Sequence, residues 1–194
     1  MKKLFFIVPV IIFSACNGGG GKSSETEEVP VEVKPVSVLS DAFNTSFEDI
    51  LNNYYALRDA LVADDTAAAN ESATRLIAAS DGLKLEELKA ADTNNVVIPT
   101  AQTYTGGISS ESRGLLGEAN IEAKRKSFQM ISGNLFDLAR TVRYTKAKIY
   151  LLTCPMAFDN AGADWLSAAT EIKNPYFGSK MLTCGSVKDS VVIK

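Results

Sequence analysis

The chain has 194 residues, and its 20 basic and 23 acidic side chains give a net charge of −3 at pH 7. With 46% hydrophobic and 22% charged residues, the composition is that of a globular protein with a sizeable core. The weak acidic balance argues against nucleic acid as a partner. The chain contains no histidine, which excludes His-dependent catalytic triads and the usual catalytic zinc sites. Because no paired carboxylates or glycine-rich phosphate loop stand out either, we do not expect an enzyme.

Residues 1–15 predict an export signal. Lys2 and Lys3 precede the apolar run LFFIVPVIIF, which is too short to span a membrane and ends in small residues before Cys16. This pattern resembles a bacterial lipoprotein signal, in which Cys16 carries the lipid and becomes the mature N-terminus. A plain signal peptide cut near Cys16 is the alternative. We therefore expect a cell-envelope protein, anchored by its N-terminal lipid to a membrane in the periplasm or at the outer membrane.

Residues 16–40 predict a flexible tether behind the lipidated cysteine. The segment NGGGGKSSETEE is polar and rich in glycine, and VPVEVKPVSV alternates valines with Pro30 and Pro35, which favours an extended chain. An edge strand is the alternative for the valines, although two prolines disfavour it.

Residues 41–194 predict one folded domain that begins with helices. Ser40 or Asp41 is a suitable N-cap for a first helix, whose apolar residues recur at spacings of three and four. This stripe consists of Phe43, Phe47, Ile50, Tyr54, Leu57 and Leu61. A second helix is predicted over 65–80, ended by the Asp81-Gly82 pair, and residues 83–90 predict a further turn or two.

A long loop is predicted next, over 91–109, because Pro99, Gly106 and Gly107 interrupt the helical pattern. One long helix then follows over 110–144. Its apolar stripe consists of Phe128, Ile131, Leu135, Leu138 and Val142. Three or four helices with one stripe each predict a mainly α fold, an antiparallel three- to four-helix bundle.

The pattern changes after Lys146. KIYLL is short and strand-like, and the remaining chain has turn residues at regular intervals with short strand-like runs between them. We predict an irregular, turn-rich C-terminal subdomain with short β segments, packed on the bundle. Such segments, when a scaffold holds them, are where function tends to lie.

Four sulfur-bearing residues bracket this subdomain, and they are Cys154, Met156, Met181 and Cys184. Thiolates and thioethers are soft ligands that favour Cu(I) or Ag(I), so the four predict a soft-metal site. In an oxidising compartment Cys154 and Cys184 also predict a structural disulfide. Both hypotheses remain open at this point. Trp165, the single tryptophan, lies between the two pairs in the sequence and is either an anchor of the core or a neighbour of the site.

The C-terminal segment resembles the motif of the DUF3347 family, which occurs in Bacteroidetes lipoproteins and in periplasmic adaptor proteins of copper and heavy-metal efflux. The matching pieces are Cys154-Pro155-Met156, Trp165-Leu166, Asn174-Pro175-Tyr176-Phe177-Gly178, Met181 and Cys184-Gly185. The helical segments ILNNYYALRDALVADD and EAKRKSFQMISGNLFDLAR also fit, so the resemblance extends over about residues 41–190. Where relatives often carry a histidine before the first cysteine, this chain has Thr153. The resemblance implies a non-enzymatic accessory protein of heavy-metal efflux or resistance, with a component of the efflux system as a partner.

Overall fold

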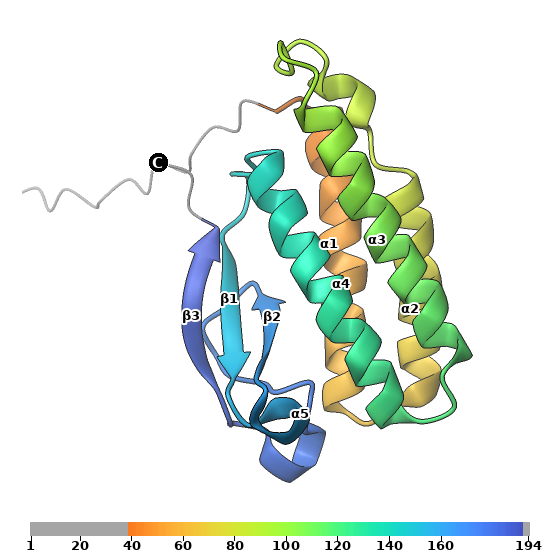
Figure 1. The fold of residues 1–194 in the computed structure, drawn as a ribbon, viewed down its shortest axis with the longest axis vertical. Coiled ribbons are helices and arrows are strands. Elements are labelled where there is room, and N and C mark those ends of the chain that lie inside the picture. Colours follow the sequence, from red (N-terminus) through yellow and green to blue (C-terminus); the bar gives the residue numbers. More distant parts are fainter. Residues whose placement is uncertain (1–38, 192–194) are drawn as a thin grey trace, which may run out of the picture. The chain divides into compact units, whose positions relative to one another are not determined.

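The computed structural model describes residues 39–191, in which four long helices precede a small sheet (Figure 1). The predicted signal, Cys16 and most of the predicted tether lie outside the described residues. The long helices are α1 (Asp41–Val62), α2 (Thr66–Asp81), α3 (Val97–Gly117) and α4 (Ile121–Thr141). None of the helices within 39–191 combines the length and the hydrophobicity that a bilayer crossing requires.

The first two helices confirm the prediction. Ser40 Oγ accepts a hydrogen bond of 3.1 Å from Phe43 N–H at the start of α1, and the whole predicted apolar stripe of α1 is buried. Asp65 Oδ1 accepts one of 2.9 Å from Ala68 N–H at the start of α2, which ends before Gly82. The short 3₁₀ helix η1 (Leu85–Leu88) follows.

The predicted loop over 91–109 is wrong for most of its length, because α3 begins at Val97. Pro99 lies in the first turn, where its missing N–H would have had no helical partner. The Asp92 carboxylate caps the start of α3: it accepts hydrogen bonds from the N–H group of Val96, which precedes the helix, and from those of Val97 and Ile98 in its first turn. Gly107 lies against α4, and a Cβ atom there would be 2.5 Å from Asn134 Oδ1. This glycine therefore permits close helix packing.

The single predicted helix over 110–144 is also wrong, because the chain turns at residues 118–120 between α3 and α4. Asn120 Oδ1 accepts a hydrogen bond of 2.9 Å from Ala123 N–H and caps the start of α4. Lys124 Nζ donates a hydrogen bond of 2.7 Å to Leu115 O, which satisfies a carbonyl in the last turn of α3. The same short turn thus ends one helix and begins the next.

The four helices form the predicted antiparallel bundle. Helices adjacent in sequence pack against each other, from α1 to α4, and the three-residue connections at 63–65 and 118–120 make the joined helices antiparallel. The predicted stripe on α4 is buried together with that of α1. The mainly α fold class is confirmed.

The sheet has three antiparallel strands, β1 (Ile149–Cys154), β2 (Ala163–Ser167) and β3 (Ser186–Val191), with β1 in the centre. In Figure 1 it lies beside α4, while α2 and α3 lie farther away. Tyr54 Oη joins the layers: it accepts a hydrogen bond of 2.9 Å from Leu166 N–H on β2 and lies 2.7 Å from Ser132 Oγ on α4. The rest of the C-terminal segment is irregular, as predicted, apart from the short elements α5 (Ala157–Asn160) and η2 (Gly178–Met181).

Candidate sulfur site

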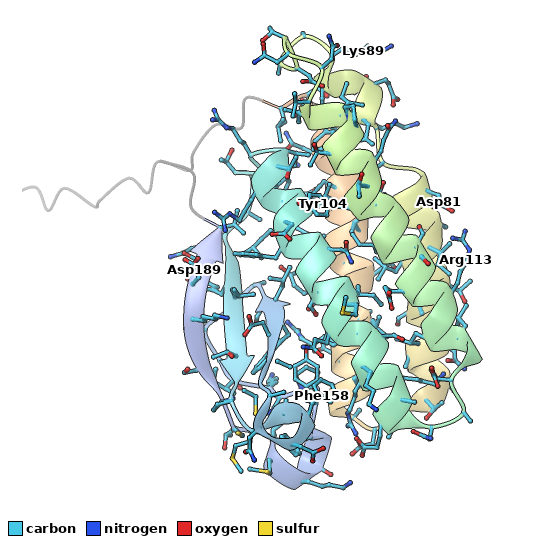
Figure 2. The ribbon with its side chains drawn as sticks, in the orientation of Figure 1. Asp81, Lys89, Tyr104, Arg113, Phe158 and Asp189 are labelled. Atoms are coloured by element: carbon cyan, nitrogen blue, oxygen red, sulfur yellow. The ribbon has the colours of Figure 1, made fainter. Side chains whose placement is uncertain are left out.

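The four sulfur-bearing residues lie next to the ends of short elements in the C-terminal segment. Cys154 is the last residue of β1, and Met156 directly precedes α5. Met181 is the last residue of η2, and Cys184 lies two residues before β3. Figure 2 shows several yellow sulfur atoms close to α5, at one end of the sheet. We call these four residues the sulfur site.

The two thiols lie side by side although 30 residues separate them in the sequence. Cys154 Sγ and Cys184 Sγ are 3.1 Å apart and share a hydrogen bond. Cys154 is fully buried, whereas Cys184 is partly exposed. The structure therefore brings together the two residues that both hypotheses require to meet, and it leaves the pair open to solvent on the Cys184 side.

The Cys184 thiol favours the protonated state at neutral pH. The hydrogen bond with Cys154 raises the pKa of the Cys184 thiol, and burial and the nearby charge of a Cys154 thiolate raise it further. A cysteine of this kind is a weak nucleophile until an opposing base or a metal removes its proton. The described part of the chain offers no histidine for that purpose.

The methionines are less closely tied to the thiols. The Met156 side chain is 46% exposed, and the Met181 side chain is partly buried. Cys184 N–H donates a hydrogen bond of 3.1 Å to Met181 O, which fixes the backbone of these two residues relative to each other. Within residues 39–191 no hydrogen bond joins either thioether to a thiol, so the methionines are linked to the cysteines through the backbone alone.

Trp165 is a core residue that also lies next to the segment carrying Cys184. It is 1% exposed, lies opposite Leu152 across the sheet, and has an edge-to-face contact with Tyr176 at 6.0 Å between ring centroids. Its ring also lies against Gly185, the residue after Cys184, because a Cβ atom there would be 2.8 Å from Trp165 Cη2. Trp165 is thus an anchor of the core whose ring edge reaches the backbone of the sulfur site.

A left-handed turn separates the first cysteine from β2. Phe158, Asp159 and Asn160 have φ values of 51°, 57° and 69°, and Gly162 follows with 80°. Three successive non-glycine residues in this region are costly, since left-handed backbone strains each Cβ atom. Strained backbone of this kind persists only where the surroundings determine it, and it clusters at functional sites.

The distance between the thiols is intermediate between two chemical end states. A disulfide requires about 2.05 Å between the sulfurs. A tetrahedral metal about 2.3 Å from each sulfur would hold them about 3.8 Å apart. From 3.1 Å, either state needs a shift of about 1 Å or less. Within residues 39–191 no group of three or more His, Cys, Asp or Glu side chains is placed to hold a metal ion. The donors at this site are therefore sulfur atoms, which are soft ligands.

Two buried polar residues near the site were not predicted as functional. Asn174 was predicted only as part of a turn and of a piece that resembles the family motif, and it is fully buried beside Cys184. Arg125 is 1% exposed, and it lies three residues before Phe128 on the buried face of α4. Extending the predicted apolar stripe backwards by three and four residues would have placed Arg125 and Lys124 on that face, which is the signal that could have found them.

The comparisons with known proteins bear on the bundle. No curated protein and no solved structure matches the chain. One family, described as a protein of unknown function (DUF3347), matches residues 50–147. The match runs from within α1 to just before β1, so the sulfur site lies beyond its end and rests on the geometry of this chain. The match covers half of the chain, and the chain belongs to the DUF3347 family.

Proposed function

We propose that this protein binds one soft metal ion, Cu(I) or Ag(I), between Cys154 and Cys184. The observation that carries the proposal is the distance of 3.1 Å between two thiols from different ends of the C-terminal segment. Thiolates bind Cu(I) and Ag(I) in preference to hard cations. Met156 and Met181 supply thioethers beside the pair, and the exposed Met156 side chain would meet an arriving ion first.

The proposal places the protein in the cell envelope as a non-enzymatic accessory of heavy-metal efflux or resistance. The lipoprotein-like segment before Cys16 supports export and anchoring to a membrane. The partner would be a component of an efflux system that accepts or delivers the ion. The non-enzymatic role is argued from an open groove between α4 and the sheet. Two ionisable side chains that line it, Asp164 and Lys188, are paired at 2.6 Å, so neither is placed as a general base.

A structural disulfide is the second candidate for the same pair. Full burial of Cys154 and the irregular chain between the two cysteines favour it. A bridge across this loop of about thirty residues would stabilise the fold by about 3 to 4 kcal/mol. In that case the pair would be a structural disulfide, and the metal-binding function would be absent.

The deciding experiment uses the chain with Cys16→Ser, in which Cys154 and Cys184 are the only thiols. Free thiols are counted with and without reductant. Reduced protein is then titrated anaerobically with Cu(I) against a competing chelator, with Trp165 fluorescence as the signal, because its ring lies against the backbone next to Cys184. We expect saturation at one equivalent, lost in Cys154→Ser.

Methionine variants test the remaining ligands with a matched control. Met156→Leu should weaken Cu(I) binding several-fold, while Met130→Leu should leave it unchanged, since Met130 is similarly exposed but lies on α4. If reduced protein with two verified free thiols does not bind Cu(I) at neutral pH, the proposal is wrong. Thiols that appear only after reduction, together with a large fall in the free energy of unfolding, would establish a structural disulfide between Cys154 and Cys184.

A further inference from the structure

Cys184 lies in a loop that is not part of the sheet, so contacts with other segments of the chain must hold it in place. This loop, residues 174–184, contains η2, Met181 and Cys184 and runs from the end of an irregular segment to β3. Cys154, by contrast, is held by strand pairing, opposite Ala163 in the sheet. The distance between the thiols therefore depends on whatever holds the loop.

Asn174 closes the loop on itself. Its N–H donates to Leu182 O at 2.8 Å, and its side-chain Nδ2 donates to Cys184 O, also at 2.8 Å. Its Oδ1 accepts the N–H of Tyr176 at 2.8 Å, and its own carbonyl accepts the N–H of Gly178 at 3.1 Å. Asn174 is fully buried, so these bonds replace water entirely.

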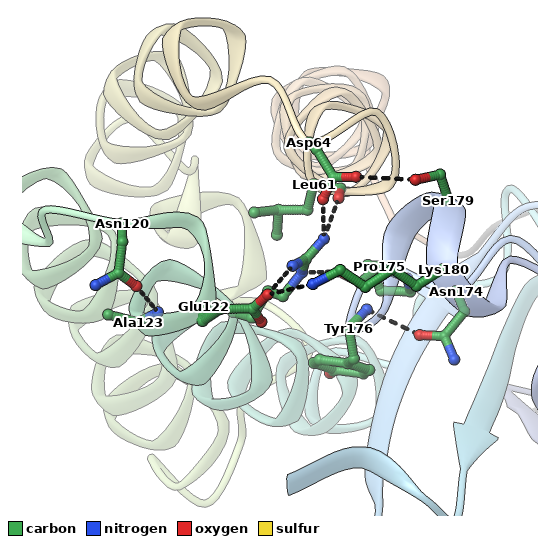
Figure 3. Close-up of polar contacts among 11 residues, drawn as sticks. Leu61, Asp64, Asn120, Glu122, Ala123, Asn174, Pro175, Tyr176, Ser179 and Lys180 are labelled. Atoms are coloured by element: carbon green, nitrogen blue, oxygen red, sulfur yellow. Dashed lines mark hydrogen bonds and ion pairs between the residues drawn. The ribbon is translucent and has the colours of Figure 1, made fainter.

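Arg125 ties the next residue to the bundle. Its Nε donates to Pro175 O at 2.7 Å, while Nη2 donates to Leu61 O at 2.9 Å and to Asp64 Oδ1 at 2.6 Å. Figure 3 shows these partners gathered around one guanidinium group, with Glu122 on its other side at 3.1 Å. The planar fork of arginine suits this set of acceptors, and lysine could not reproduce it.

The loop is also packed tightly against this cluster. Gly178 has φ +55°, and a Cβ atom there would be 2.8 Å from the Asp64 carboxylate and 2.9 Å from Arg125 Nη2. Only glycine fits this position without displacing the ion pair. The bundle thus reaches Cys184 through an unbroken series of contacts, from Asp64 and Leu61 through Arg125 and Pro175 to Asn174.

We infer that Asn174 and Arg125 are positioning residues of the sulfur site: they hold the loop 174–184 so that the Cys184 thiol stays beside Cys154. The inference rests on the proposed function for its metal readout. Fixing the second thiol beside the first raises its effective concentration for any reaction that uses both sulfurs. The same two residues should therefore control metal binding and disulfide closure alike.

The sharpest variant is Asn174→Asp, in the chain with Cys16→Ser. It keeps the size of the side chain and the acceptor for Tyr176 N–H, but it removes the donor to Cys184 O. The added negative charge attracts a cation but also disfavours the neighbouring thiolates. The glutathione equilibrium, which binds no ion at the site, therefore decides the positioning role. The control is Asn134→Asp, which makes the same chemical change on α4, where Asn134 Nδ2 bonds Met130 O at 2.9 Å.

Two equilibria are measured on each variant. The first is Cu(I) affinity against a chelator. The second is the exchange of the reduced protein with glutathione disulfide, in which the two protein thiols form a disulfide and one glutathione disulfide becomes two glutathione thiols. We expect Asn174→Asp to lower both equilibrium constants about tenfold, the effect of one buried hydrogen bond. Asn134→Asp should change neither by more than about twofold.

The outcomes separate this inference from the proposed function. If the unaltered pair does not bind Cu(I), the proposed function fails, and the glutathione equilibrium alone decides the positioning role. A folded Asn174→Asp protein whose glutathione equilibrium stays within about twofold of the unaltered pair would overturn the inference. If Asn174→Asp does not fold, Arg125→Lys decides it, since lysine keeps the charge beside Asp64 but loses the bond to Pro175 O.

Discussion

Replacing Gly185 by alanine tests how closely Trp165 and the strand pack around the sulfur site. Gly185 has φ +146°, which strains any residue with a Cβ atom, and that atom would lie 2.7 Å from Thr153 O and 2.8 Å from Trp165 Cη2. The backbone strain costs about 1 kcal/mol, and displacing a strand carbonyl and a buried ring costs about 2 kcal/mol more. We therefore expect the free energy of unfolding to fall by about 3 kcal/mol, a loss of about 10 °C in Tm.

The assay is urea unfolding in reductant, followed by Trp165 fluorescence and by helix circular dichroism. Gly106→Ala is the control. Gly106 lies within α3, and an added Cβ atom there would have no other group within 4 Å apart from the adjacent helix backbone. There the same added methyl group should stabilise the helix by about 0.5 to 1 kcal/mol. A Gly185→Ala protein within about 0.5 kcal/mol of the unaltered chain would refute the packing described around the site.

Three further predictions concern buried tyrosines and the pH dependence of the site. Burial raises the pKa of Tyr54, Tyr144 and Tyr176. Because the folded pKa exceeds the unfolded value of about 10, stability should be complete below pH 10 and fall above it. Absorbance should show these three tyrosines ionising only as the protein unfolds. Tyr54→Phe should cost about 1 to 3 kcal/mol in urea unfolding, because the buried N–H of Leu166 loses its acceptor, and an unchanged midpoint would contradict this. The raised pKa of Cys184 predicts that apparent Cu(I) affinity increases about 10- to 100-fold per unit between pH 6 and 8, as one or two thiol protons are released; a flat profile would exclude thiolate binding.

The bundle could be predicted where the sequence pattern is local. The stripe on α1 and the cap at Ser40 follow from spacing and side-chain chemistry within a few residues, and both are as predicted. The prediction failed at Pro99 and Gly107, which usually interrupt helices. Their tolerance depends on position: Pro99 lies in a first turn, and Gly107 faces a neighbouring helix that the sequence alone does not place.

The sulfur site could be predicted only in part. Residue chemistry selected four sulfur-bearing residues, of which the structure places the thiols of Cys154 and Cys184 together. The roles of Asn174 and Arg125 were not predictable, because their partners are backbone carbonyls up to 64 residues away. Tertiary packing determines which carbonyl groups surround a buried side chain, and the spacing of residues in the sequence does not reveal it.

The long reach of the contacts that hold the sheet has a consequence for the order of folding. The helix pairs are formed by neighbouring segments, whereas Tyr54 meets Leu166 across 112 residues and Arg125 meets Pro175 across 50. Local contacts close quickly, and distant ones wait for the chain to be ordered between them. We expect the bundle to form first and the loop with Cys184 to dock last, so the two thiols would stay apart through most of folding. An ion or an oxidant would then find the pair only on a nearly complete protein.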